Sequence, residues 1–187
     1  MTAQISNRFV FNGIVYSIIA QEYPLDYSPS IHGIVPCQEC TACWRGYYCK
    51  FVVDKDQLFL RNLDVFIIDD QEPIIINDIA PIVMGGVWEY LNLYIPIKYT
   101  GSVLIGTDFI NEYYIHMGYQ QFFAYKTVYE LTFHEGRLNK FEDFSKEVEK
   151  FRQMNPDVHA QTKDDILNQI SRLFSLDYKN KWFLNSR

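Results

Sequence analysis

Four cysteines form the densest group of reactive side chains in the sequence: Cys37, Cys40, Cys43 and Cys49, spaced C-x2-C-x2-C-x5-C. Thiolates at such short intervals can bind an iron–sulfur cluster. Zinc sites more often use two separated pairs of ligands, and no second Cys/His pair follows in this chain. A C-x-x-C pair can also catalyse thiol exchange, but the βαβ pattern that surrounds such pairs is missing. We therefore expect ordinary reduced thiols and no cofactor, with a metal site and redox activity left open as alternatives.

The residues that follow Cys43 could recognise a ligand. Arg45 can stack on an aromatic ring or bind a carboxylate through two parallel hydrogen bonds, and Trp44 and Tyr47 supply rings beside it. Such a group suits an acidic or planar ligand. The simpler alternative is that Trp44 and Tyr47 lie in the core or at its rim while Arg45 pairs with a nearby acid.

His116 is a second candidate, because an imidazole titrates near neutrality and can act as a general base. Pairing with Cys40 or Cys43 would create a minimal nucleophile–base arrangement, although nothing in the sequence shows that they meet. A histidine with its hydrogen bonds satisfied is the simpler interpretation. Tyr119 belongs to an aromatic stretch, residues 113–125, that is too dense to be buried completely. Exposed aromatic clusters typically mark an interaction surface or a ligand groove.

Composition narrows the function classes. The chain has 187 residues, of which 48% are hydrophobic and 17% aromatic, so it can bury a core without disulfides or metal. Its 17 basic and 23 acidic side chains give a formal net charge of −6, which argues against a nucleic-acid partner. It contains no phosphate-binding glycine loop, zinc-protease motif or nucleophile elbow. The residues define no coherent catalytic group and favour a non-enzyme, while an enzyme stays open.

The amino-terminal residues MTAQISNRFVF lack the pattern of a secretory signal, because polar residues interrupt every apolar run. No stretch approaches the roughly 20 apolar residues that span a bilayer. We therefore expect a cytoplasmic protein without a membrane partner, in a compartment where thiols stay reduced.

Turn residues between apolar runs predict mainly antiparallel strands. Asn12-Gly13 supplies the positive φ angles of a type I′ turn and predicts a hairpin over 8–20. Residues 22–36 contain three prolines and predict a long loop. The stretch 107–118 fits either a helix or a strand, and we slightly favour a strand or irregular structure. Further strands are expected over 46–54, 57–68 and 126–133.

Apolar residues recur at helical spacing near the C-terminus and predict amphipathic helices over about 142–154 and 163–175. The expected fold class is α+β: a predominantly antiparallel β-sheet that is curled, or closed towards a barrel or sandwich, with these two helices. We expect residues 1–140 to form the β domain and residues 141–187 to form a helical extension that packs on it as one compact unit.

Three segments resemble a family of small bacterial proteins of unknown function: residues 1–7 (MTAQISN), 40–47 (CTACWRGY) and 99–138, which contains the run HMG before an aromatic strand. The octapeptide and the HMG run are the most specific marks. The resemblance covers roughly the first 140 residues, and Cys37 and Cys49 lie outside its pattern. It implies a bacterial, cytosolic origin and no activity.

Two functional hypotheses follow. The acidic charge and the many aromatic rings favour a non-catalytic binding or interaction protein, whose partner could be a protein that it neutralises, as immunity proteins do. The alternative is a small-molecule or enzymatic pocket built around Cys40, Cys43, Arg45 and His116, which requires these side chains to converge in one cavity. The sequence does not predict the oligomeric state.

Overall fold

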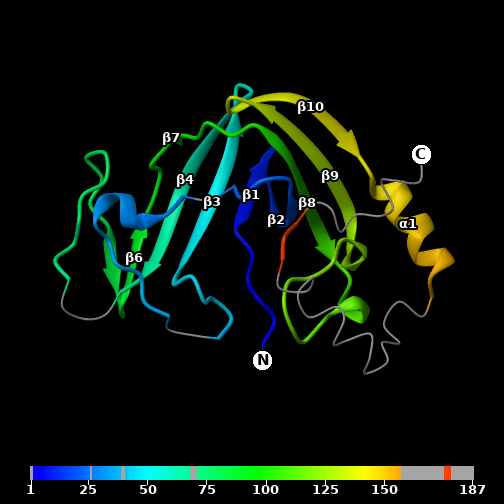
Figure 1. Ribbon diagram of the computed structural model, residues 1–187, viewed down its shortest axis with the longest axis horizontal. Helices are drawn as coiled ribbons and strands as arrows, with labels where there is room; N and C mark the ends of the chain where they lie inside the picture. Colours follow the sequence, from blue (N-terminus) through cyan, green and yellow to red (C-terminus); the bar gives the residue numbers. More distant parts are fainter. Residues whose placement is uncertain (1, 26, 39–40, 68–70, 157–174, 178–187) are drawn as a thin grey trace.

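The computed structural model describes residues 2–25, 27–38, 41–67, 71–156 and 175–177 (Figure 1). Most of the described residues lie in strands or in the short turns between them. The elements are β1 (Arg8–Phe11), β2 (Ile14–Gln21), η1 (Pro29–His32), β3 (Tyr47–Asp54), β4 (Gln57–Phe66), β5 (Ile82–Met84), β6 (Val87–Tyr90), β7 (Ile95–Pro96), β8 (Gly101–Phe109), η2 (Asn111–Tyr113), η3 (Phe122–Ala124), β9 (Tyr125–His134), β10 (Arg137–Asp143) and α1 (Ser145–Met154).

The described strands form one mixed sheet in the order β10-β9-β8-β2-β1-β3-β4-β6-β5, with β7 beside β4. Nearly all neighbours are antiparallel, which confirms the expected β-rich α+β class. Asn12 and Gly13 have the positive φ angles of the predicted turn, and β1 and β2 form the predicted hairpin. The exception to the antiparallel pattern is the pair β1–β3, which is parallel because the chain crosses over through residues 22–46 before it returns beside β1.

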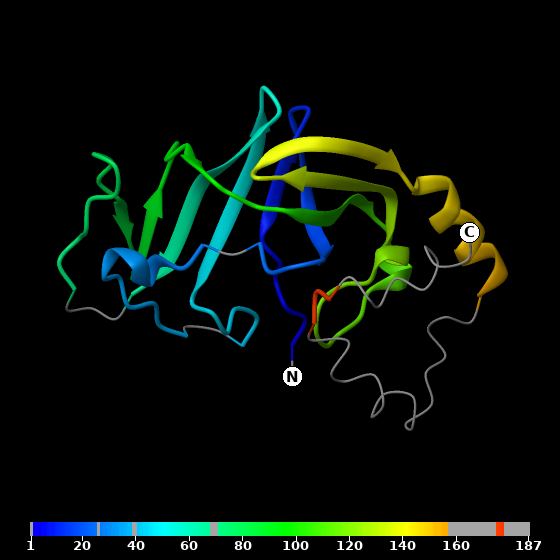
Figure 2. The same cartoon turned by 45° about the horizontal axis from the view of Figure 1, so that its top comes forward.

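The sheet curls until two hairpin tips meet (Figure 2). Arg137 of β10 pairs with Gln57 of β4, so that β4, β3, β1, β2, β8, β9 and β10 form a ring that is closed at one end. The amide of Leu58 donates to the carbonyl oxygen of Gly136 at 2.8 Å. Gly136 has a φ of +80°, and a Cβ there would lie 2.1 Å from the Ile97 carbonyl oxygen. This junction therefore requires glycine.

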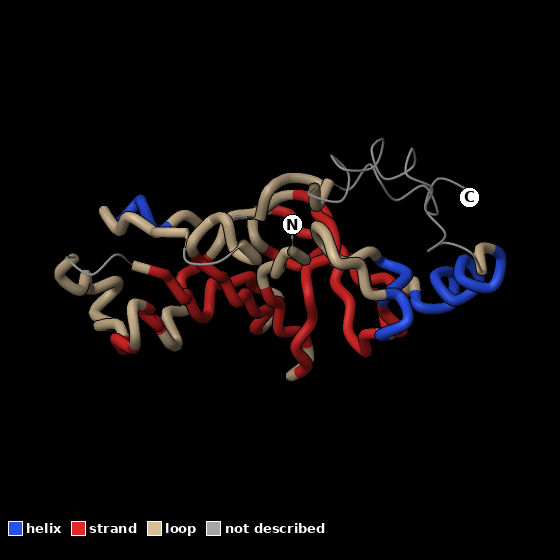
Figure 3. The backbone as a smooth tube through the Cα atoms, turned by 90° about the horizontal axis from the view of Figure 1, so that it is seen from below, coloured by secondary structure: helices blue, strands red, loops and turns tan. Residues whose placement is uncertain are grey.

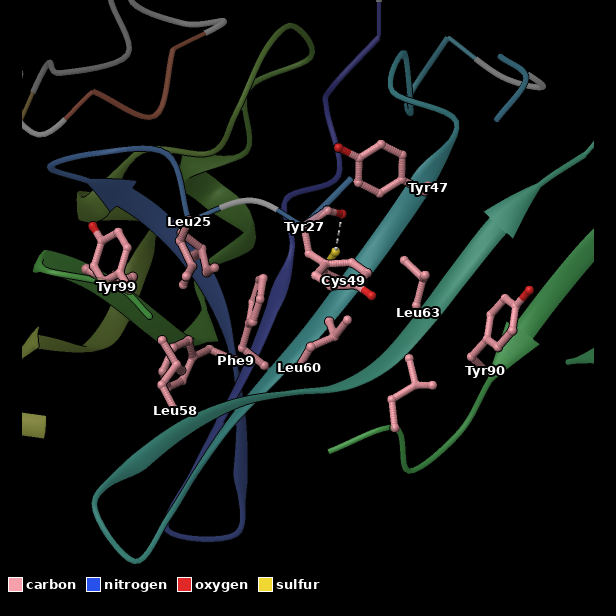
Figure 4. Packing of buried hydrophobic residues seen from close by; sticks show 14 of the residues in the cluster. Phe9, Leu25, Tyr27, Tyr47, Cys49, Leu58, Leu60, Leu63, Tyr90 and Tyr99 are labelled. Atoms are coloured by element: carbon pink, nitrogen blue, oxygen red, sulfur yellow. Dashed lines mark hydrogen bonds between the residues drawn. The ribbon is translucent and has the colours of Figure 1, made fainter. Parts of the chain in front are cut away.

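The interior of the curl is filled by a cluster of aromatic and branched side chains (Figure 4). Phe9 and Phe51 on adjacent strands and Tyr90 on β6 are fully buried. The loop 22–36, as predicted, has little regular structure, and it contributes Leu25 to the same cluster. Burial of each such side chain contributes about 1.5–3 kcal/mol, so this cluster is the main source of stability.

A second cluster joins side chains of the sheet to those of α1, and Figure 3 shows this helix at one end of the sheet. Val148 and Phe151 of the helix pack on Phe122 and Phe123. The helix predicted over about 142–154 is confirmed, but it begins at Ser145 because β10 continues to Asp143. The second predicted helix, over 163–175, falls almost entirely outside the described residues. None of the described helices has the length and hydrophobicity that a bilayer crossing requires.

Candidate functional site

The N-terminal segment, residues 2–6, runs between two loops that are far apart in the sequence (Figure 1). On one side the amide of Ile5 donates to the carbonyl oxygen of Ala42 at 3.0 Å. On the other side the amide of Gln4 donates to the carbonyl oxygen of Gly118 at 2.7 Å. The segment therefore joins the cysteine-rich loop to the loop that carries His116.

A cleft of about 630 Å³ opens beside this segment. Arg8, Ser17 and Ile18 of the β1–β2 hairpin lie on one side of it, and the N-terminal segment and Ala42 lie on another. The volume is within the range of about 300–1,000 Å³ that is usual for small-molecule sites. None of the described residues that line the cleft is acidic.

Aromatic rings form the remaining wall of the cleft. The rings of Tyr114 and His116 meet edge to face, with their centroids 4.9 Å apart. Phe109 contacts Tyr125 in the same geometry at 5.4 Å, and Tyr119 completes the wall. Edge-to-face contacts of this kind hold rings in fixed orientations, so the wall presents a preformed aromatic surface.

Three polar groups, those of Arg8, Ser17 and Tyr125, lie near one another in this cleft. Arg8 and Ser17 are direct partners across the β1–β2 hairpin, and Nη1 of Arg8 donates to Oγ of Ser17 at 2.8 Å. Burial raises the pKa of Tyr125, while a hydrogen bond from Ser17 and the charge of Arg8 oppose that shift. The phenol of Tyr125 is therefore protonated at neutral pH and is available as a donor.

The position of Tyr125 depends on two supporting residues. A Cβ at Gly106 would lie 2.8 Å from Cγ of Tyr125 and 2.4 Å from Cδ1 of Ile19, so only glycine leaves room for this ring. From the opposite side, Arg152 of α1 donates from Nη1 to the carbonyl oxygens of Phe123, at 3.1 Å, and Tyr125, at 2.8 Å. Arg152 is 8% exposed and fixes the start of β9 to the helix.

A smaller hollow, of about 100 Å³, adjoins the cleft and shares Gln4, Ile5 and Tyr119 with it. Cys43, Trp44 and Arg45 line it together with Tyr119. Arg45 also lies over the ring of Tyr47, 5.4 Å from its centroid. Tyr47 itself is buried in the interior cluster. Of the predicted binding residues, His116 therefore lines the larger cleft, Trp44 and Arg45 line the smaller hollow, and Tyr119 lines both.

The cysteines do not form a single group in the described part of the chain. Cys43 and Cys49 are buried, and each Sγ lies within hydrogen-bonding distance of a backbone carbonyl oxygen. Cys37 is partly exposed, and Cys40 lies outside the described residues. Within residues 2–25, 27–38, 41–67, 71–156 and 175–177, no three His, Cys, Asp or Glu side chains are placed to hold a metal ion.

The expected pocket around Cys40, Cys43, Arg45 and His116 cannot be followed at Cys40, which lies outside the described residues, and its other three residues do not line one common cavity. Cys43 and Arg45 line the small hollow and His116 lines the cleft, and Gln4, Ile5 and Tyr119 line both. Arg8, Ser17 and Tyr125 also line the cleft and were not predicted as site residues from the sequence. The two-residue turn at Asn12-Gly13 could have indicated the first two, because it sets Arg8 opposite Ser17.

Comparison with models of protein families, with curated proteins and with solved structures finds no match to this chain. The resemblance to an uncharacterised bacterial family therefore stays a prediction. Its three segments do lie together in the structure, because residues 2–6 are bonded to both Ala42 and Gly118.

Proposed function

We propose that this chain is a non-catalytic binding protein and that the 630 Å³ cleft is its binding site. The observation that carries the proposal is the combination of an aromatic wall with an oriented guanidinium in a cleft of ligand size. Small-molecule sites are typically apolar surfaces with a few well-placed polar groups, and this cleft has that composition.

The arrangement of polar groups favours binding over catalysis. Catalysis by a nucleophile needs a base in contact with it and a group that orients the base. Among the described lining residues, the hydroxyl of Ser17 is bonded to Arg8, and the imidazole of His116 lies against Tyr114. These groups are placed for recognition, and Cys43 faces the other hollow.

Blocking the cleft tests the proposal. Indole, benzamide and benzoate are titrated into ¹⁵N-labelled protein, and we expect at least one of them to shift amide signals of the lining residues. Ala42→Trp places a large ring at the cleft wall and should abolish these shifts. Ala80→Trp, at an exposed position that does not line the cleft, is the matched control and should leave them intact. Unchanged spectra with all three probes, or equal shifts in both variants, would contradict the proposal.

A protein partner is a second candidate, favoured by one observation. Strand β5 ends the sheet order, and among the described residues it pairs only with β6. Its three side chains, Ile82, Val83 and Met84, are 48%, 54% and 62% exposed. An apolar edge strand can accept a strand from another protein through main-chain hydrogen bonds. We propose that a neutralised partner protein would dock here, consistent with the acidic charge of the chain.

Site-specific photo-crosslinking tests this second candidate. A benzophenone amino acid at position 83 should give one defined protein adduct in cells. The same residue at position 15, where Val15 is 50% exposed on the β1–β2 hairpin, should not give it. Equal adducts from both positions, or none from position 83, would exclude docking at β5.

Several finer predictions rest on the sequence alone. We propose a bacterial source and a cytoplasmic location. We also propose that a second amphipathic helix over 163–175 belongs to the C-terminal extension, residues 141–187. Limited proteolysis of the whole chain tests the last point, because a packed helix protects its backbone from cleavage.

A further inference from the structure

We infer that the ligand of this cleft is a small aromatic carboxylate, with its carboxylate bound by Arg8 and its ring held among Tyr114, Tyr119 and Tyr125. This inference rests on the proposed function, because it names the class of ligand that the same site takes. Three independent features of the cleft support it: charge, shape of the donor group and nature of the walls.

The first feature is an uncompensated positive charge. Arg8 supplies the only permanent charge among the described lining residues. Neither of the two ion pairs found in the described part of the chain involves Arg8; they join Lys140 to Glu142 and Arg152 to Glu149. A guanidinium without a carboxylate partner attracts an anion, particularly in a cleft whose walls have a low dielectric constant.

The neighbouring strand strengthens this positive charge. In the parallel pair β1–β3, Lys50 is the register partner of Arg8. The Lys50 ammonium also lowers the pKa of Asp64, against a larger rise caused by burial and by Glu89, and Lys50 is not among the residues that line the cleft. Arg8 therefore remains the direct binding group, and Lys50 adds to the field around it.

The second feature is the geometry of the donors. Because one Nη of Arg8 is held by Ser17, the guanidinium is fixed in orientation while its other N–H groups stay available. A planar carboxylate matches a single oriented guanidinium with two parallel hydrogen bonds. A dianionic phosphate is usually bound by several cations or by a helix N-terminus, and neither lines this cleft within the described residues. The donor set therefore favours a monoanionic carboxylate over a phosphate.

The third feature is the aromatic wall. Phe109, Tyr114, Tyr119 and Tyr125 line the cleft with Arg8, and edge-to-face contacts join Phe109 to both Tyr114 and Tyr125. An aromatic ring of the ligand can stack between such walls, whereas an aliphatic acid would lose these contacts. The phenol of Tyr125, close enough to Arg8 and Ser17 for both to lower its pKa, adds a donor to the same cleft.

A matched pair of probes isolates the contribution of charge. 2-Naphthoate and 2-naphthamide have the same ring system and a planar group of the same size, but only the first is an anion. By calorimetry at pH 7 and low salt, we expect 2-naphthoate to bind at least tenfold more tightly than 2-naphthamide.

Arg8→Met should remove this difference in affinity while the protein retains its circular dichroism spectrum. Arg8→Gln serves as a second variant if the first does not fold. Arg137→Met removes an exposed arginine of β10 that does not line the cleft, and it should leave the preference unchanged.

The outcomes separate this inference from the proposed function. Equal affinity for the two naphthyl probes in the wild-type protein would overturn the carboxylate assignment and leave a binding cleft in place. Tighter binding of phenyl phosphate than of benzoate would overturn it in the same way. A preference for naphthoate that survives in Arg8→Met and Arg8→Gln would refute the role of Arg8. If neither naphthyl probe binds while indole shifts the lining residues, the inference is wrong and the binding protein stands. If no aromatic probe binds, both proposals are wrong.

Discussion

We expect the substitution Arg152→Met to destabilise the protein by about 3 kcal/mol. Arg152 is 8% exposed, and its Nη1 donates to two backbone carbonyl oxygens, those of Phe123 and Tyr125. Methionine keeps most of the side-chain volume and removes both donors. The two carbonyl oxygens lie at the start of β9, beneath α1, where they would lose these charged partners.

The magnitude follows from the two bonds. A hydrogen bond to a charged group contributes about 1.5–3 kcal/mol net, so two of them contribute at least about 3 kcal/mol. The loss stays near the lower end of this range, because the variant no longer pays the desolvation cost of burying the arginine cation. For a chain of this length, each 1 kcal/mol shifts the melting temperature by about 2–4 °C. We therefore expect a decrease of about 6–12 °C.

Urea unfolding followed by circular dichroism measures this loss directly. The linear dependence of the unfolding free energy on urea gives both the stability and the slope, and an unchanged slope shows that both proteins unfold to comparable states. Lys150→Met, which removes an exposed cation from the same helix, is the matched control and should change stability by less than about 0.5 kcal/mol. A loss at Arg152 no larger than the loss at Lys150 would refute the reasoning.

Three further predictions concern charge, backbone strain and alkaline pH. Burial and the directly opposed Glu89 raise the pKa of Asp64, so the folded protein favours the protonated carboxyl. The contribution of Asp64 to the free energy of unfolding is therefore lost as the pH rises through its folded pKa. Asp64→Asn should therefore stabilise the protein by about 0.2–1 kcal/mol at pH 7 and have little effect below pH 3.8, and an equal effect at both pH values would contradict this cause. Lys55→Asn should stabilise by about 0.5–1 kcal/mol in urea unfolding, because Lys55 has a φ of 47° that asparagine tolerates better; an unchanged midpoint would count against it. Burial raises the pKa of Tyr90 and of Tyr99 to about 12, so stability should fall from about pH 10 as the pH rises through 12; Tyr90→Phe should make this fall shallower, and an identical pH profile would exclude Tyr90 as a contributor.

Local features of this fold could be read from the sequence. Asn12-Gly13 has the backbone angles that its residue types require, and Lys55-Asp56 forms the same kind of turn without glycine. Helix α1 ends at Met154, immediately before Asn155-Pro156, as proline requires. At Asn12-Gly13 and at the end of α1 the determining interactions lie within a few residues, so residue type carries the information; Lys55 is the exception, because its residue type does not favour a φ of 47°.

The non-local features could not be read in this way. Strands β1 and β3 pair in parallel. Parallel strands are usually joined by a helical crossover, and the residues between these two strands have no helical pattern from which the pairing could be predicted. The register of β2 on β8 shifts between Ile18 and Ala20, and only tertiary packing selects that shift. Tyr125 belongs to β9 and is brought to the cleft by its pairing with Phe109 of β8, so the sequence could suggest the Arg8–Ser17 pair but not the cleft that surrounds it.

The meeting of the two hairpin tips has a consequence for the order of folding. Gln57 and Arg137 are about 80 positions apart, and contacts between such distant residues carry a large loop-closure cost, which slows folding. The hairpins β3–β4 and β9–β10 need only local contacts, so we expect them to form early and their junction to form last. During synthesis the start of β4, at Gln57, stays unpaired with β10 until residue 138 has left the ribosome. The growing chain is therefore most exposed to aggregation in that interval.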